Sequence, residues 1–170
     1  MTAYKFRIDT GYAGTLSREP APGDITPESL DPAANWSAYG FGLPVKYNGS
    51  GQITPLTGGE TASQIAGLLV RSYPGRAVTN TGRTAYPQIN GGAQDTARRG
   101  FMSVVLNGAG TPVKGSPVYV RVANPGTGEF IGGFEATVDA TAGNQIELPN
   151  ARFEGPAGSD GITEISFNLQ

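Results

Sequence analysis

Hydrophobic and polar residues alternate with period two in several short stretches of the chain, most clearly at residues 113–139. Val118, Val120 and Val122 alternate with small or polar residues, which is the pattern of a strand with two unlike faces. A Pro-Gly-Thr-Gly run then supplies turn residues, and residues 130–138 alternate again. We therefore expect two extended segments here, joined as a β-hairpin.

A second hairpin is predicted nearer the N-terminus. Residues 43–47 and 52–56 are strand-like and flank an Asn-Gly-Ser-Gly turn. The following segment, residues 65–70, is apolar on both faces, which indicates a central strand. A helix over residues 61–70 is the alternative, because only one glycine interrupts that window.

Strand patterns continue to the C-terminus. Residues 101–106 read as a buried strand, residues 145–148 and 151–154 as two strands separated by a Pro-Asn break, and residues 165–169 as a terminal strand. Together with 26 glycines and 13 prolines, about eight closely spaced strands predict an all-β fold. We expect a small antiparallel β-barrel or β-sandwich.

Two segments lack this pattern. Residues 1–37 form an irregular N-terminal arm, and residues 74–99 form a long Gly-rich flap within a β-domain that spans residues 38–170. In the arm, Thr26 is a candidate N-cap for a helical turn over residues 27–30. The arm either packs on its own domain as a loop or becomes ordered on a partner.

The arm and the flap differ in charge. The arm carries five acidic residues between Asp9 and Asp31 against one base, Arg18. The flap has the opposite balance, with Asp95 against four arginines, namely Arg76, Arg83, Arg98 and Arg99. Arm and flap can therefore dock on each other, on neighbouring copies or on another protein. The alternative is that the arginines are solvated.

Several function classes are excluded by residues that the chain lacks. It has no cysteine and no histidine, which removes disulfides, Cys/His zinc sites and Ser-His-Asp chemistry. A formal net charge of −2 gives no general affinity for nucleic acid. No stretch approaches the roughly 18 apolar residues of a membrane span, and no signal peptide is visible. We expect a protein that is made in the cytoplasm and has neither a nucleic-acid nor a membrane partner.

The remaining chemical motifs are weak. Gly126, Gly128 and Gly132 suggest a dinucleotide loop, but a strand rather than a helix follows them. Fourteen carboxylates could include a glycosidase pair, although they are mostly spaced singly. Residues 90–95 offer oxygen ligands for calcium without paired acids. We expect no cofactor, no metal and no enzymatic activity.

Three aromatic residues, Trp36, Tyr39 and Phe41, lie where the arm meets the first strand. Packing in the core is the expected role. An anchor at an interface is the alternative, because large aromatic side chains dominate binding energy when a partner buries them.

Five segments resemble a known family. They are Gly-Leu-Pro-Val at 42–45, Ile-Ala-Gly-Leu-Leu-Val-Arg at 65–71, Gly-Phe-Met-Ser-Val-Val at 100–105, Val-Lys-Gly-Ser-Pro-Val-Tyr-Val-Arg at 113–121 and Leu-Pro-Asn-Ala-Arg-Phe at 148–153. Over roughly residues 38–169 the chain resembles the structural cement, or head decoration, proteins of tailed bacteriophages. The arm is not matched.

This resemblance implies a small β-protein of the virion that binds the outside of an assembled capsid. Its partners would be the major capsid protein, whose lattice it stabilises, and copies of itself, as a homotrimer or alternatively a dimer. The family has no catalytic residues. We expect capsid contacts in the arm and the flap, at Tyr4, Phe6, Tyr12, Leu16, Trp36, Arg76, Arg83, Tyr86, Arg98 and Arg99.

Two rival functions stay open at this stage. A carbohydrate- or receptor-binding β-module of a virion or cell surface would need exposed aromatics in a groove, for which Tyr73, Tyr86 and Tyr119 are candidates. A hydrolase that uses carboxylates would need two acids that converge in a cleft.

Overall fold

The computed structural model describes residues 11–37, 39–71, 92–108 and 110–169. Its strands form two five-stranded sheets in which every neighbouring pair is antiparallel. The first sheet has the order β1 (Ile25–Ser29), β5 (Ala93–Ala97), β4 (Gly67–Leu69), β2 (Pro44–Tyr47) and β3 (Ile53–Pro55). The second has the order β6 (Arg99–Val105), β10 (Ile162–Asn168), β9 (Gln145–Phe153), β7 (Pro117–Arg121) and β8 (Phe134–Glu135).

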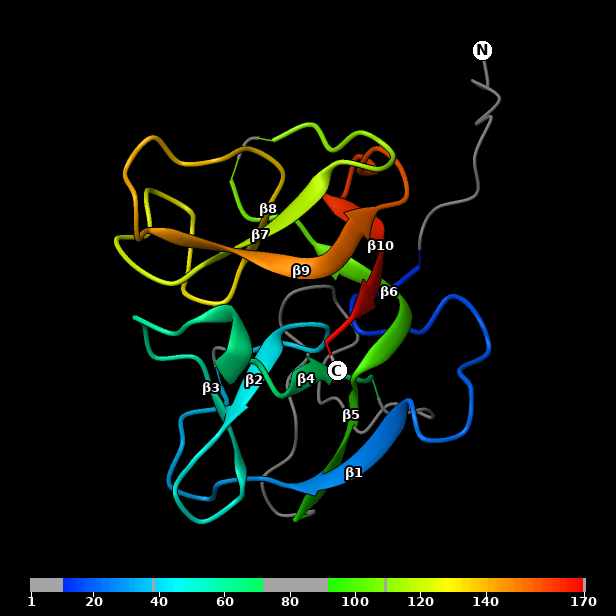
Figure 1. The fold of residues 1–170 in the computed structure, drawn as a ribbon, viewed down its shortest axis with the longest axis vertical. Coiled ribbons are helices and arrows are strands. Elements are labelled where there is room, and N and C mark those ends of the chain that lie inside the picture. Colours follow the sequence, from blue (N-terminus) through cyan, green and yellow to red (C-terminus); the bar gives the residue numbers. More distant parts are fainter. Residues whose placement is uncertain (1–10, 38, 72–91, 109, 170) are drawn as a thin grey trace.

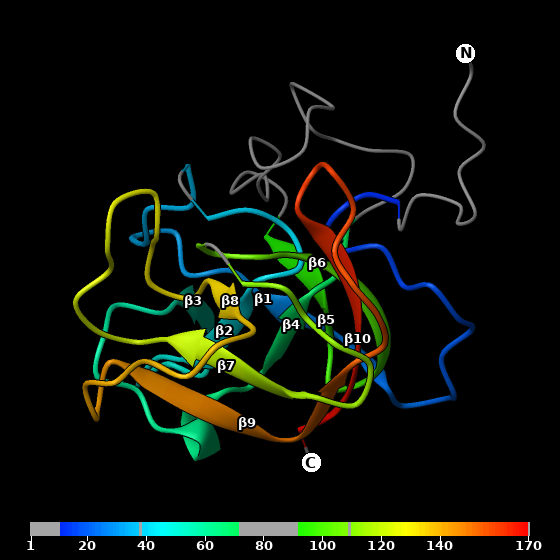
Figure 2. The same ribbon diagram turned by 90° about the horizontal axis from the view of Figure 1, so that it is seen from above.

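The two sheets lie one above the other and are joined by a nearly continuous strand. In both views β5 runs directly into β6, so the chain passes from one sheet to the other with one residue between the strands (Figure 1 and Figure 2). The predicted all-β class is confirmed, and the arrangement is sandwich-like rather than a closed barrel.

One core serves both sheets. Val45, Leu68 and Ile53 of the first sheet and Met102 and Ile165 of the second are completely buried in the same hydrophobic cluster. Because each sheet has one apolar face, stacking the two faces removes both from water at once. The C-terminal strand β10 lies between β6 and β9, as expected for a chain end that is tied into the fold.

The aromatic group before the first predicted hairpin is part of this core. Trp36 has no exposed surface, and its ring meets Tyr39 edge to face, with centroids 6.3 Å apart. Its indole Nε1–H donates to the Asp31 carbonyl at 2.9 Å, and the Tyr39 hydroxyl donates to the Pro44 carbonyl. Burial raises the pKa of Tyr39. This group therefore packs in the core, which is the role expected from the sequence.

The hairpin of β2 and β3 and the central strand β4 are confirmed. The first residue of β4, Gly67, has to be a glycine. A Cβ at this position would lie 2.5 Å from Thr96 Cγ2 and 2.7 Å from the Ala97 carbonyl oxygen. The two backbones can approach only without a side chain. A short 3₁₀ helix, η1 (Ala62–Gln64), takes up part of the window in which a longer helix was the alternative.

The hairpin predicted at 113–139 is confirmed for its first strand and shortened for its second. β7 pairs with β8, but β8 has only two residues. Gly132, with φ of +88°, comes just before β8, and a Cβ there would collide with the Tyr39 side chain. The chain therefore turns at the point where the alternating pattern predicted a continuous strand.

The break predicted at Pro149 and Asn150 is wrong, because β9 runs through it. The register of β9 against β7 shifts between Pro117 and Tyr119, which marks a bulge. Asn150 takes a φ of +57° inside this bulge. A bulge leaves residues unpaired, so it accommodates a proline that has no N–H to donate.

The helical turn predicted at 27–30 is also wrong. Residues 25–29 are strand β1, in register with β5 from Ile25 opposite Ala97 to Ser29 opposite Ala93. Pairing with a neighbouring strand outweighs the local capping signal at Thr26. For the described residues 11–37, packing on the same body is the alternative that holds.

The last part of the predicted flap is strand as well. Residues 93–97 form β5 and Arg99 begins β6, whereas residues 72–91 of the flap lie outside the described part. The strand pattern was missed because the inward positions of β5 are polar: Gln94 and Thr96 are buried. The Gln94 side chain donates to the Val70 carbonyl at 2.7 Å, which compensates its loss of water.

A strap at residues 13–17 connects the two sheets. The Gly14 N–H donates to Ser103 of β6 at 2.8 Å, and its carbonyl accepts from Arg71, just after β4, at 2.8 Å. A Cβ on Gly14 would lie 2.6 Å from Phe41 Cβ and 2.8 Å from the Gly42 nitrogen. Only glycine fits where the strap crosses this segment.

Candidate interaction surface

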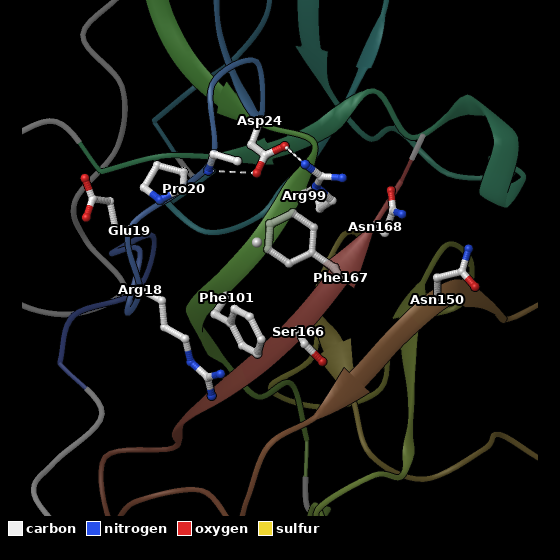
Figure 3. A pocket seen from close by; sticks show the side chains of 12 residues that line it. Arg18, Glu19, Pro20, Asp24, Arg99, Phe101, Asn150, Ser166, Phe167 and Asn168 are labelled. Atoms are coloured by element: carbon white, nitrogen blue, oxygen red, sulfur yellow. Dashed lines mark hydrogen bonds and ion pairs between the residues drawn. The ribbon is translucent and has the colours of Figure 1, made fainter.

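A groove of about 450 Å³ lies between the loop at residues 17–24 and the outer face of the second sheet (Figure 3). This loop stands out at the side of the body in both ribbon views. Three strands of the sheet, β6, β10 and β9, contribute Phe101, Ser166 and Asn150 to the groove. An open groove with an aromatic residue on its floor is a candidate site for a partner.

At one end of the groove, Arg18 lies over Phe101. The guanidinium carbon is 3.5 Å from the ring centroid, which is a cation–π contact. The guanidinium is also 3.8 Å from Glu164, yet the Arg18 side chain stays 54% exposed. Arginine and aromatic side chains are enriched at protein interfaces, and this exposed Arg18 side chain is accessible to a partner.

At the other end, Arg99 meets Asp24, with 2.8 Å between Nη2 and Oδ1. Asp24 is buried and also accepts from the Ala21 backbone N–H at 3.0 Å, so its carboxylate holds both the loop and Arg99. The Arg99 side chain remains 47% exposed. The groove thus has an accessible guanidinium at each end.

The neighbouring arginine, Arg98, forms its polar contacts with residues of the same chain. Its Nη2 donates to Glu28 at 3.1 Å and to the Tyr47 hydroxyl at 2.6 Å, and that hydroxyl donates to Glu28 at 2.7 Å. Burial and then Glu28 raise the pKa of Tyr47. Of the charge-docking alternatives, contact between arm and flap within one chain is therefore realised through Asp24–Arg99 and Glu28–Arg98.

The other candidate contact residues are placed as follows. Tyr12 is 56% exposed, with the Arg71 guanidinium 5.0 Å from its ring. Leu16 is half-buried in the strap and bridges to Met102 of β6. Trp36 is inside the core and offers no surface to a partner. The remaining five, Tyr4, Phe6, Arg76, Arg83 and Tyr86, lie outside the described residues.

Sequence reasoning missed the groove and most of the residues that line it. In the sequence Arg18 stands out only as the single base of an acidic arm, and Phe101 only as part of a buried strand. The alternation of β6 contains a signal, since Arg99 and Phe101 share one face while the completely buried Met102 lies on the other. The approach of the loop to that face is a long-range contact that no local pattern predicts.

A second hollow, of about 180 Å³, lies beside β7 and β8 and contains a buried ion cluster. Arg121 donates through Nε and Nη2 to both oxygens of Glu135 at 2.8 Å. It also lies 2.5 Å from Asp139 and 3.2 Å from Glu129. Donation to Glu135 is the main cause that raises the pKa of Arg121.

These acids converge, as a carboxylate hydrolase requires, but their electrostatics point the other way. The backbone N–H of Thr141, the amide of Asn144 and Arg121 together lower the pKa of Asp139 to about 2. A general acid in a glycosidase needs a raised pKa so that it carries a proton at neutral pH. Asp139 is instead an ionised ligand of Arg121, and the cluster has the features of a structural clamp.

Two further features of the described residues bear on function. No group of three or more acidic side chains there is arranged to hold a metal ion. No helix in the described ranges is long and apolar enough to cross a membrane.

Comparison with known proteins identifies the family. No curated protein sequence matches the chain. A chain in a solved structure titled "The capsid of Myoviridae Phage XM1" shares the fold, with a TM-score of 0.65 and 19% identity over 99% of this chain and 96% of that one. The family model described as structural cement protein (E217 gp24/Pam3 gp6) matches residues 1–168. The chain therefore belongs to the phage structural cement protein family and is a structural protein of the virion capsid.

Proposed function

We propose that this protein binds the outer surface of an assembled phage capsid and ties neighbouring major capsid proteins together. The observation that carries the proposal is the family match over residues 1–168, which includes the N-terminal arm as well as the sheets. In this role the chain has no catalytic function. Its work is to hold subunits of a shell that other proteins build.

The groove is the part of the described surface that best suits capsid contact. Arg18 and Arg99 are about half exposed at its two ends, and Phe101 is half-buried between them. Burying such residues under a partner contributes most of the energy of typical interfaces. We include Tyr12, which precedes the strap, because it is exposed and already ordered against Arg71.

The candidates outside the described residues remain part of this proposal. They are Tyr4, Phe6, Arg76, Arg83 and Tyr86. The chain acts as a homotrimer or, alternatively, as a dimer on the lattice. Arg98 ranks below Arg99 as a contact, because Glu28 and Tyr47 already engage its guanidinium.

Stabilisation follows from mass action. A ligand that binds the assembled lattice but not free subunits lowers the free energy of the lattice by RT ln(1 + [L]/Kd) at every site. Each copy needs only modest affinity, because the same contact is repeated across the whole shell.

The test is a binding titration on capsids that lack this protein. Phe101→Ala and Arg18→Ala should each weaken binding about tenfold or more, because both remove the stacked pair on the groove floor. Lys114→Ala is the matched control, since Lys114 is 77% exposed and its ion pair with Glu154 is long, at 3.7 Å. Unaltered binding by both groove variants would exclude the groove, and no binding by the wild-type protein would exclude capsid association.

A further inference from the structure

The described strands leave few backbone groups free along the edges of the sheets. An unpaired edge strand is a template for pairing with another chain. In the second sheet the strap covers the edge of β6: the Gly14 N–H donates to Ser103, Ser103 donates back to Thr15 at 3.0 Å, and Ser17 donates to Phe101 at 3.1 Å. Residues of the same chain therefore occupy this edge.

The opposite edge of that sheet is covered too. Strand β8 receives a parallel bridge from Leu106 to Phe134, and the Asn107 N–H donates to the Phe134 carbonyl at 2.6 Å. In the first sheet, β3 is covered in the same way by the continuation of β1. Leu30 bridges to Ile53, and the Asp31 N–H donates to the Ile53 carbonyl at 2.9 Å.

Strand β1 is the end strand of the first sheet, with only β5 beside residues 25–29 among the strands described (Figure 1). Two backbone hydrogen bonds fix the direction of its backbone groups. Leu30 donates to Gly92 at 3.0 Å, and Arg98 donates to Asp24 at 2.8 Å. Since hydrogen-bonded pairs alternate along an antiparallel ladder, Asp24 and Leu30 share the orientation in which the groups point towards β5.

The residues between these positions have the opposite orientation. Ile25, Pro27 and Ser29 turn their backbone nitrogens and carbonyls away from β5. The central one of these three is a proline, which has no N–H to offer to an incoming strand. Its side chain is exposed, so packing in the core does not account for a proline at this position.

We propose that Pro27 closes the β1 edge to strand addition, so that neither another copy nor a partner extends the first sheet at this strand. A proline on an exposed edge strand prevents another strand from completing its ladder of bonds. Many copies at neighbouring lattice sites would otherwise bring identical edges together at high local concentration. Self-association through the edge of β1 is thereby prevented.

The experiment restores the missing donor and then removes a neighbouring one. Pro27→Val supplies an outward N–H and should make the apparent mass rise about twofold with concentration in sedimentation velocity, as edges pair. In the double variant Pro27→Val, Ser29→Pro, the second substitution removes the outward N–H of residue 29. The edge then again lacks one donor, two residues further along. This double variant should behave like the wild-type protein at every concentration.

Two results would overturn the proposal. If Pro27→Val keeps the wild-type dependence of mass on concentration while its far-ultraviolet circular dichroism stays native, the edge is closed by something else. If the double variant self-associates as strongly as Pro27→Val, the exposed valine and not the N–H drives association. Neither measurement involves capsids, so the outcome is independent of whether the protein binds them.

Discussion

The two hollows of the molecule contain similar groups and put them to different use. In the hollow beside β7 and β8, the Arg121 side chain is 6% exposed and has three carboxylates within 3.2 Å. In the groove, Arg18 and Arg99 each have one nearby carboxylate and remain about half exposed. The burial of the arginine decides the role, because water screens the exposed guanidinium groups of Arg18 and Arg99 more than that of Arg121. The cluster stabilises the fold, and the groove is left for a partner.

The largest expected effect comes from breaking the buried cluster. Arg121→Met should lower the free energy of unfolding by roughly 3–5 kcal/mol, since it leaves the buried carboxylate of Glu135 without its cation. Urea unfolding followed by tryptophan fluorescence measures this. Arg152→Met is the control, because Arg152 and Glu147 are both about half exposed at 3.6 Å and should contribute under about 1 kcal/mol. Equal losses for the two variants would contradict the division between clamp and groove.

The next effect concerns the strap that joins the sheets beside the groove. Gly14→Ala should cost roughly 2–4 kcal/mol, because it combines a strained positive φ with a clash against Phe41 and Gly42. Gly11 has a similar φ, but a Cβ at that position would meet no atom within 4 Å, so Gly11→Ala should cost only about 1 kcal/mol. Thermal unfolding of the two variants compares them directly, and a similar cost for both would mean that the crossing is not tight.

Acid should weaken the clamp in a defined window. The pKa of Asp139 is about 2 in the folded protein, below the value of about 3.9 for an unfolded aspartate. Between these values the unfolded chain binds more protons, so the stability that Asp139 contributes is present above about pH 4 and is lost as the pH falls towards 2. Urea midpoints across this range should fall less steeply for Asp139→Asn than for the wild-type protein. Parallel curves would show that Asp139 is not held ionised.

The smallest effect on stability, and a large one on binding, is expected in the groove. Arg99→Ala should lower the free energy of unfolding by roughly 1–2 kcal/mol, because Arg99 itself is half exposed and the buried Asp24 keeps the hydrogen bond from the Ala21 N–H. The same change should weaken capsid binding about tenfold, if the groove is covered by a capsid subunit. A variant that loses stability but binds normally would reverse the roles assigned to the two hollows.

How much of this could be predicted from the sequence depended on which residues face inward. Strands such as β7, whose inward positions are valines, were predicted from alternation alone. Strand β5 was missed because the polar residues Gln94 and Thr96 occupy its inward positions, where the Gln94 amide donates to the Val70 carbonyl. Pro149 does disturb the regular pairing, because β9 has a bulge at this point. The bulge lets the strand continue past the proline, so the predicted break does not occur.

The candidate surface was predicted less well than the fold. Contact between the basic flap and the acidic arm was one of the alternatives that the charges left open, and the Asp24–Arg99 and Glu28–Arg98 pairs realise this contact. The stacking of Arg18 on Phe101 depends on how the loop folds over β6, which no pattern in either segment encodes. Trp36 was named as a candidate contact, but it is completely buried. Its burial depends on how the whole core packs.

The most direct measurement is the release of DNA from capsids on heating, with and without this protein bound. If the chain ties capsid proteins together, decorated particles should release DNA at a higher temperature, and Arg18→Ala protein added at the same concentration should give a smaller rise. Identical release temperatures for bare and fully decorated particles would contradict a cementing role.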